Sequence, residues 1–356
     1  MNITFIIGNG FDLQLGIKSK YSDFLDEYTK ELSDDTISIK KFKRYLCQAK
    51  NRELWSDAEA AMGNYLGEFS NGTLTQYTEH ILDFETKMIE YLEQQQNRCV
   101  FKDSRRISGV FKDFLLNSFS DILNRRGKEI NAYGNTNNII NFISFNYTNL
   151  LEELILRIVN DKKIIRSRRN TYLDQIGNIY HVHGTLSSQI IMGVNDELQL
   201  NSSGGVTLTP QLRSQLIKPI MNNLSNHNWD VPAKEVIKIS DIILIYGVSF
   251  GKTDALWWEE LNKWIKANKN HKLIVFMREN DNAFERRIPW EEINYENHKR
   301  IEVLEKIGIS EDDDTFETLL NQVYIILNTE RLDISEILLP QDTLTLPENS
   351  TSLVGV

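Results

Sequence analysis

The chain has 356 residues, 41% of them hydrophobic and 25% charged, and a formal net charge of −10. This composition is typical of a globular protein of roughly two domains, and the acidic balance argues against non-specific binding to nucleic acid. The two cysteines lie far apart, no signal peptide is recognisable, and no apolar run approaches the roughly 20 residues that span a membrane. We therefore expect a cytoplasmic protein without membrane contact.

A short apolar run near the start predicts a buried strand from Ile3 to Ile7. The run ends in GNGFD, where glycines let the backbone turn sharply or approach a ligand closely. A strand that passes through glycines into a helix is a common seat for phosphates, although such glycines also serve as plain turn residues. We expect the N–H groups here to hold a diphosphate, and Asp12 to bond a ribose or cap the helix. The candidate nucleotide-binding residues are Gly8, Asn9, Gly10, Phe11 and Asp12.

Residues 36–135 carry apolar side chains at helical spacing among charges, which predicts a mostly helical insertion. Five short apolar runs follow it: IINFISFN, IYHVHG, IIMGVN, DIILIYGVSF and HKLIVFM. Charge-free runs that alternate with amphipathic helices predict a three-layer α/β fold with a mainly parallel sheet. The predicted domains are an α/β nucleotide-binding domain (1–35 and 136–330), the helical insertion (36–135) and a C-terminal tail (331–356).

Polar residues follow several of the predicted strands. Asn146 ends one run, His183 ends the next, and Gly247, Ser249 and Asp254 follow a later one. In an open parallel sheet, ligands bind at the carboxyl ends of the strands. We therefore expect these residues and the GNGFD loop to converge on one crevice.

Three of these residues also have other interpretations. Asn146 can simply cap a following helix, as Asn often does. His181 and His183 form an H-x-H pair that can bind zinc, but the other histidines lack supporting spacing, so we expect no metal and a structural role for His181. Ser249 lies in GVSFG, which matches the nucleophile elbow of serine hydrolases but needs a partner such as His271 or His298.

Two charged stretches are interpreted as surface features. Asp57 and Glu59 in WSDAE lie in the helical insertion, where they favour surface and packing roles over an acid–base pair. The basic stretch KKIIRSRRN favours a solvated loop over a nucleic-acid-binding patch.

Six stretches follow one another in chain order: IIGNGFDLQLGIKSKYSDF, LWSDAE, ISFNYTNLLE, HVHG, IIMGVND and YGVSFGKTD. Between residue 3 and about residue 254, they resemble the bacteriophage abortive-infection AbiH family. That family in turn is similar to the sirtuin-like branch of Rossmann-like folds.

The sirtuin-like resemblance assigns roles to individual residues. FNYT is similar to the sirtuin Q-N-I-D stretch, so Asn146 corresponds to the asparagine that contacts the nicotinamide riboside. His183 and the glycine after it are similar to the catalytic H-G pair. Gly247-Val248-Ser249 is similar to the nucleotide-binding G-T-S turn, which implies that Ser249 and Asp254 border the adenosine half.

The sequence also departs from the sirtuin pattern. The first loop lacks a proline and an arginine, Thr148 stands where sirtuins have an aspartate, and a four-cysteine zinc module is missing. These departures argue against protein deacetylation and leave NAD+ binding open.

The resemblance implies an antiphage abortive-infection protein that hydrolyses NAD+, its substrate, to nicotinamide and ADP-ribose. Asn146 and His183 are the expected catalytic residues, and the unperturbed pKa of histidine, about 6.5, suits a general base. The alternatives are a nucleotide-sensing module without turnover and a metal-dependent nuclease that uses His181 and His183. The family implies a phage-derived trigger or partner protein, and the sequence leaves a monomer and a homo-oligomer both open.

Overall fold

The computed structural model describes most of the chain, and all structural statements below concern this part of it. Of the tail predicted for residues 331–356, only residues 331–332 are described. The described residues are 1–30, 35–48, 55–99, 104–118, 135–159, 162–168, 171–225, 228–278, 289–329 and 331–332.

Seven strands form one sheet in the order β3-β4-β2-β1-β5-β6-β7. All neighbouring pairs are parallel except β3 with β4, so the predicted α/β fold with a mainly parallel sheet is confirmed. The strands are β1 (Asn2–Ile7), β2 (Asn138–Ser144), β3 (Ile164–Arg168), β4 (Tyr172–His181), β5 (Ile242–Tyr246), β6 (Lys272–Met277) and β7 (Val323–Leu327).

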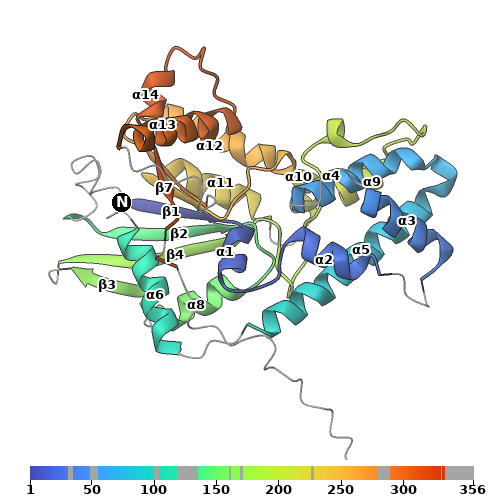
Figure 1. The fold of residues 1–356 in the computed structure, drawn as a ribbon, viewed down its shortest axis with the longest axis horizontal. Helices are drawn as coiled ribbons and strands as arrows, with labels where there is room; N and C mark the ends of the chain where they lie inside the picture. The colour runs from blue at the N-terminus through green and yellow to red at the C-terminus, as the bar shows by residue number, and fades with distance from the viewer. Residues whose placement is uncertain are drawn as a thin grey trace, which may run out of the picture.

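Helices cover both faces of this sheet and form a separate group beyond the carboxyl ends of its strands (Figure 1). The α-helices of the described residues are α1 (Asn9–Gln14), α2 (Tyr21–Tyr28), α3 (Ile37–Gln48), α4 (Trp55–Tyr65), α5 (Leu74–Asn97), α6 (Ser104–Asn117), α8 (Leu150–Ile158), α9 (Pro210–Leu216), α10 (Lys218–Leu224), α11 (Asp230–Ile239), α12 (Ala255–Ala267), α13 (Pro289–Lys306) and α14 (Phe316–Leu320).

Two hydrophobic clusters lie on opposite faces of the sheet. All five residues of β5 are buried, because its side chains alternate between the two clusters. On one face α6 and α8 pack with Leu244, and on the other α11, α12 and α13 pack with Ile243 and Ile245. Burial on both faces explains why β5 reads as an uninterrupted apolar run.

A third cluster forms the core of the helical part, and its composition differs from the predicted insertion. It includes α2, which precedes residue 36, and Leu212 and Leu216 of α9, far beyond residue 135. Conversely, α6 lies within the predicted insertion but packs on the sheet through Phe111 and Phe114. The helical part is therefore assembled from two separated stretches of chain, which helical periodicity alone does not reveal.

Three local expectations differ from the structure. The stretch IIMGVN, expected as a strand, contributes only isolated bridges, because Val194 pairs with Ile217 outside the sheet. The basic stretch expected as a loop contains the edge strand β3, whose Arg166 forms an ion pair with the buried Asp174. Strand β7 at the other edge was not anticipated.

The glycines after β1 have a structural explanation. A Cβ atom on Gly8 would lie 2.6 Å from the carbonyl oxygen of Gly247. A Cβ atom on Gly10 would lie 2.5 Å from the Cα atom of Gly247. Gly247 itself has a φ of 71°, a conformation that favours glycine. The loops after β1 and β5 therefore contact each other backbone to backbone, and side chains at these positions would separate them.

We expect Gly10→Ala to lower the free energy of unfolding by at least about 2 kcal/mol, because the new methyl group would overlap backbone atoms. Gly109→Ala in α6 is the matched control, since a Cβ there meets nothing within 4 Å. The control should be neutral or stabilise by roughly 0.5–1 kcal/mol. Urea unfolding of both variants measures the difference, and equal stabilities would contradict this packing explanation.

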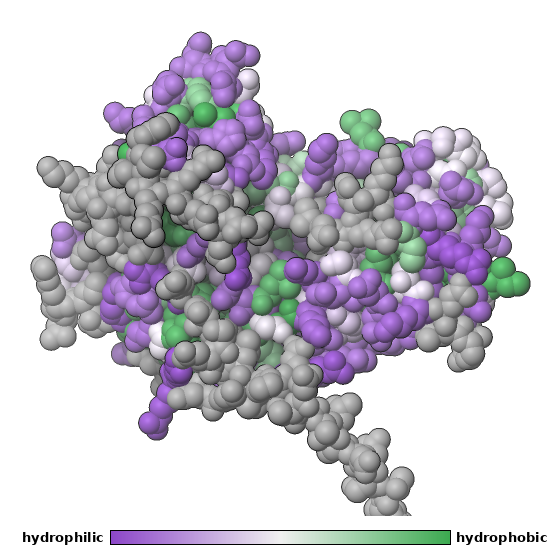
Figure 2. All heavy atoms as spheres, viewed as in Figure 1, coloured by the Kyte–Doolittle hydropathy of each residue, from purple (hydrophilic) through white to green (hydrophobic). Residues whose placement is uncertain are grey.

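The surface in Figure 2 is mainly hydrophilic, and hydrophobic residues form only small patches on this face. Within the described residues, no helix combines the length and apolar character that a membrane crossing requires.

Candidate functional site

A cavity of about 350 Å³ lies where the carboxyl ends of β1, β2, β4 and β5 meet the helical part. Nine of the ten predicted site residues line it, and Phe11 is the exception. Its lining comprises Gly8, Asn9, Gly10, Asp12, Leu13, Ser19, Lys20, Glu59, Leu92, Phe145, Asn146, Tyr147, Thr148, His183, Gly247, Val248, Ser249, Gly251, Asp254 and Trp258.

The GNGFD loop lines the cavity, but its polar groups are largely engaged within the protein. The N–H groups of Gly8, Gly10 and Phe11 donate to carbonyl oxygens of Tyr246, Gly247 and Gly8, each at 2.9 Å. The Phe11 side chain is fully buried in the core of the sheet. These three N–H groups are therefore not available to a diphosphate, which corrects that expectation.

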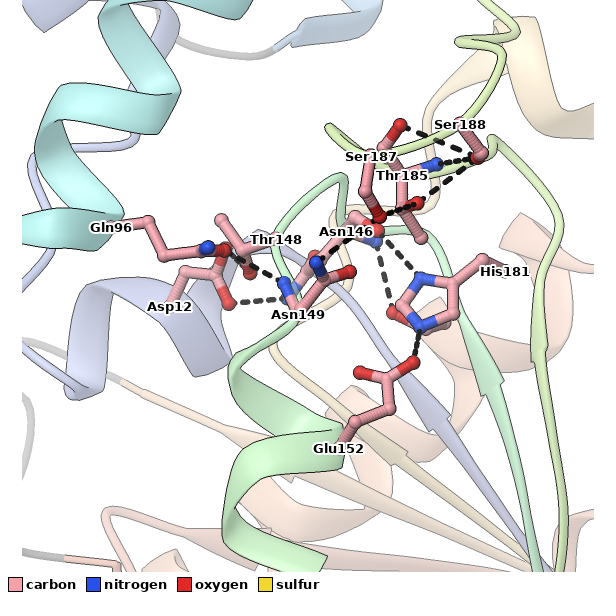
Figure 3. Close-up of polar contacts among 11 residues, drawn as sticks. Asp12, Gln96, Asn146, Thr148, Asn149, Glu152, His181, Thr185, Ser187 and Ser188 are labelled. Atoms are coloured by element: carbon pink, nitrogen blue, oxygen red, sulfur yellow. Dashed lines mark hydrogen bonds and ion pairs between the residues drawn. The ribbon is translucent and has the colours of Figure 1, made fainter.

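Asp12 lines the cavity and bonds two neighbouring polar side chains (Figure 3). Its carboxylate accepts hydrogen bonds from Asn146 Nδ2 and Thr148 Oγ1, both at 2.8 Å. Neither Asp12 nor Asn146 caps a helix through its side chain, since α1 begins after Gly8 and α8 after Asn149. Because a carboxylate only accepts, Asn146 presents its amide nitrogen to Asp12 and retains Oδ1 as an acceptor.

Burial raises the pKa of Asp12 to about 7, although the hydrogen bonds from Thr148 and Asn146 oppose this shift. The carboxyl group is only 3% exposed, so removal from water dominates. Asp12 therefore changes protonation state near neutral pH. Its carboxyl group is also the one that accepts the hydrogen bond from Asn146 and so orients that side chain.

The raised pKa of Asp12 predicts a pH-dependent stability. The folded chain binds this proton more tightly than the unfolded chain, so the stabilisation is present at low pH and is lost as the pH rises through about 7. Between about pH 5 and about pH 8, the wild type should lose about 2–3 kcal/mol more unfolding free energy than Asp12→Asn. Urea unfolding at both pH values measures this difference, and parallel losses in the two proteins would refute it.

His181 is buried and contacts the backbone of Asn146 (Figure 3). Its Nδ1 donates to the backbone carbonyl of Asn146 at 3.0 Å, and its Nε2 contacts the Glu152 carboxyl group of α8. The predicted structural role with satisfied hydrogen bonds agrees with this geometry. His181 and His183 contact different carboxyl groups, so they do not form a shared ligand pair.

His183 lines the same cavity and belongs to an ionic cluster. Its Nε2 is 2.9 Å from Asp254 Oδ1, and Lys218 Nζ is 2.8 Å from the same oxygen. Burial raises the pKa of Asp254, but the Lys218 ammonium and His183 outweigh this effect and hold the pKa below its usual range. Asp254 is therefore ionised, and the His183 Nε2–H donates to it. Asp254 thus contacts the histidine, and its place beside an adenosine stays a prediction.

Glu59 joins the same cluster from α4 of the helical part, so the surface part of its predicted surface and packing role was wrong. Its side chain is 4% exposed, and its Oε1 lies 2.8 Å from Lys218 Nζ. Gly193 N–H and the Thr253 hydroxyl also donate to it. Burial raises the pKa of Glu59, and Lys218 opposes this shift. The small residues around it, in DAEAAMG, were the available sign of a buried helix face.

Aromatic rings enclose the cavity around His183. Phe145 stacks on the imidazole at a centroid distance of 5.1 Å, and Tyr147 lies 6.2 Å away. Trp258 contacts Phe145 edge to face at 5.7 Å. The cavity therefore combines aromatic surface with three carboxyl groups, of which Glu59 and Asp254 are paired with Lys218.

Ser249 lies between this cavity and a second one of about 580 Å³, and it lines both. The left-handed backbone near it belongs to Gly247 and Phe250, not to the serine as a nucleophile elbow would require. His271, one proposed triad partner, stacks on Trp264 in the core. Among the described residues, no cluster of three or more His, Cys, Asp or Glu side chains has an arrangement suited to a metal ion.

Fold and site together define a class: an α/β protein whose mostly parallel sheet and helical part enclose an acidic, aromatic cavity. The model of the family described as bacteriophage abortive infection AbiH matches residues 4–276, which include every residue that lines the cavity. The chain belongs to this bacteriophage abortive infection AbiH family, as its motifs predicted. A search of curated proteins found no match.

Proposed function

We propose that this protein is an antiphage enzyme that hydrolyses NAD+ to nicotinamide and ADP-ribose and so starves an infected cell. The observation that supports it is the geometry of Asn146 and His183 in one cavity. Each is anchored by one nitrogen to a carboxylate, Asp12 or Asp254. This anchoring leaves Asn146 Oδ1 and His183 Nδ1 without hydrogen-bond partners among the described residues. Two free acceptors beside a ligand cavity are suited to orient and deprotonate water.

The strand order supports a nucleotide ligand. When the antiparallel edge strand β3 is set aside, the parallel strands follow the order third, second, first, fourth, fifth, sixth along the chain. Doubly wound dinucleotide-binding sheets have this order, and they bind ligands at the point where it reverses. Here that point lies between β1 and β5, beside the cavity. We therefore infer a Rossmann-like, sirtuin-like fold.

The charges of the cavity support a substrate with a cationic leaving group. Asp12, Glu59 and Asp254 supply carboxyl groups, and Phe145 and Trp258 supply aromatic surface. The pyridinium ring of NAD+ is both aromatic and positively charged. The volume of about 350 Å³ falls in the range of roughly 300–1,000 Å³ for ligand sites, and it suits the nicotinamide riboside end.

The phosphates of NAD+ need a partner other than the glycine N–H groups. Lys20 is exposed, lines the cavity, and has no ion-pair partner among the described residues. Its ammonium group is the cation that we assign to the phosphates, because a compact, mobile charge suits a partly solvated diphosphate.

The reaction requires one water molecule. Its oxygen forms a bond to C1′ of the nicotinamide-bearing ribose as the C1′–N1 bond breaks, through an oxocarbenium-like transition state. The electron pair of that bond neutralises the pyridinium ring, so nicotinamide leaves uncharged and needs little acid assistance. His183 Nδ1 takes the proton of the water, and Asn146 Oδ1 accepts a hydrogen bond from the water or the 2′-hydroxyl.

Release of nicotinamide from NAD+ by the purified full chain, with and without phage lysate, tests this proposal. We expect turnover that Asn146→Ala abolishes, whereas Asn149→Ala, a neighbouring asparagine outside the cavity lining, retains it. Binding of NAD+ without turnover under either condition would refute the hydrolase.

A nucleotide-sensing module is the second candidate. Thr148 stands where sirtuins carry an aspartate, and here it is committed to a hydrogen bond with Asp12. Calorimetry with NAD+ and ADP-ribose separates the two candidates: a sensor binds NAD+ and leaves it intact, whereas an enzyme consumes it.

A further inference from the structure

The ionic cluster of His183, Asp254, Lys218 and Glu59 contains more charge than the proposed reaction uses. All four side chains are largely buried, with exposed fractions of 7%, 14%, 6% and 4%. Burying an ion pair costs desolvation energy, and apolar replacements are often as stable. A buried cluster beside a cavity therefore favours a functional role.

The four groups come from four separate parts of the chain. His183 follows β4, Asp254 precedes α12, Lys218 begins α10, and Glu59 lies in α4 of the helical part. Lys218 Nζ bridges the two carboxylates, at 2.8 Å from Asp254 Oδ1 and 2.8 Å from Glu59 Oε1. Glu59 of the helical part is thus connected to His183 through Lys218 and Asp254.

We propose that Asp254 and Lys218 are positioning residues for His183, and that Glu59 holds Lys218 in place from the helical part. Lys218 keeps Asp254 ionised and directs its Oδ1 toward the imidazole, so that oxygen takes the Nε2–H. Nδ1 is then the unprotonated nitrogen of the ring. As a contribution to catalysis this rests on the proposed function, whereas the state of the ring can be measured without turnover.

Other groups also face the imidazole and must be considered in any pH dependence. Asp230 of α11 interacts with His183, and burial raises the pKa of this carboxyl group to about 6. The Tyr147 ring lies 6.2 Å from the imidazole between centroids, and burial raises the pKa of its hydroxyl well above the usual value, so it stays neutral. Asp254 is the carboxylate in direct contact with the ring. A change at Asp254 or Lys218 should therefore dominate the response.

NMR of ¹⁵N-histidine-labelled full-length protein tests the proposal through the pH midpoint and tautomer of His183. In the wild type the neutral ring should be the Nε2–H tautomer. Asp254→Asn removes an anion in contact with the ring and should lower the midpoint by about one pH unit or more. Lys218→Gln removes a cation and should raise it by about half a unit.

Lys252→Gln is the matched control, because it removes an exposed positive charge from the same short helix as Asp254 and should leave the His183 midpoint unchanged. Unchanged midpoints in both cluster variants would overturn the proposal, as would an Nδ1–H tautomer in the wild type. A shift in Asp254→Asn alone would overturn the role of Lys218. If Lys218→Gln does not fold, Asp254→Asn still decides the role of Asp254.

The NMR result and the turnover result are independent of each other. The expected shifts without nicotinamide release would leave the positioning roles intact and overturn the NAD+ hydrolase. Nicotinamide release with an unshifted histidine would do the reverse. Where turnover is present, Asp254→Asn should lower kcat and shift the pH profile.

Discussion

Replacement of His183 by alanine should reduce the rate of NAD+ hydrolysis by at least ~10²-fold, the usual contribution of a general base. The imidazole is the cavity group with a free ring nitrogen that can take the proton of the attacking water. The loss should appear in kcat, because the base acts on the water and not on the binding of NAD+. Nicotinamide release measures it.

The matched control is His298→Ala, since His298 is exposed on α13 and does not line the cavity. It should leave the rate unchanged. Circular dichroism and calorimetry should show that His183→Ala remains folded and still binds NAD+. An undiminished rate in His183→Ala would exclude His183 as the base and leave Asp12, with its pKa of about 7, as the cavity carboxyl group to test next.

Replacement of Lys218 by methionine should lower the free energy of unfolding by about 3–5 kcal/mol, the usual cost of breaking a buried ion pair from one side. Lys218 is the cation between Glu59 and Asp254. Without it, two buried carboxyl groups face each other, and one must take up a proton or lose its partners. Urea unfolding measures the loss.

Two comparisons sharpen this prediction. Lys238→Met breaks an exposed pair with Glu235 and should cause no measurable change. The double variant Glu59→Leu with Lys218→Met removes both members of one pair, and it should recover part of the loss. A loss in Lys218→Met no greater than in Lys238→Met would show that the cluster does not hold the helical part to the sheet.

The sheet could be predicted in outline because its strands are buried on both faces. Strand β5 shows this most clearly, since every residue of IILIY is buried and apolar. The edge strand β3 escaped prediction for the opposite reason. Its sequence, IIRSR, has only two apolar residues and carries two arginines, so only its pairing with β4 identifies it.

The site could be predicted only where its residues follow strands. Asn146 and His183 end neighbouring strands, so the parallel sheet brings them together. Glu59 and Lys218 follow helical patterns that carry no such information. Whether a helix turns a charge toward solvent or toward a strand end depends on long-range packing, here the assembly of the helical part from two distant stretches of chain.

The glycine loop shows a second limit of sequence reasoning. A strand followed by GNG predicts close approach of the backbone to something, and this inference agrees with the structure. The partner, however, is the backbone at Gly247 and not a phosphate. The steric requirement for a small residue is the same in both cases, so the sequence could not distinguish a ligand from a neighbouring loop.

The most direct test of the account is a crystal structure of the His183→Ala protein with NAD+. We predict that the nicotinamide riboside occupies the cavity of about 350 Å³, with C1′ between Asn146 Oδ1 and position 183 and the phosphates near Lys20. NAD+ bound elsewhere on the chain, or a cavity that stays closed to it at saturating concentration, would contradict the account.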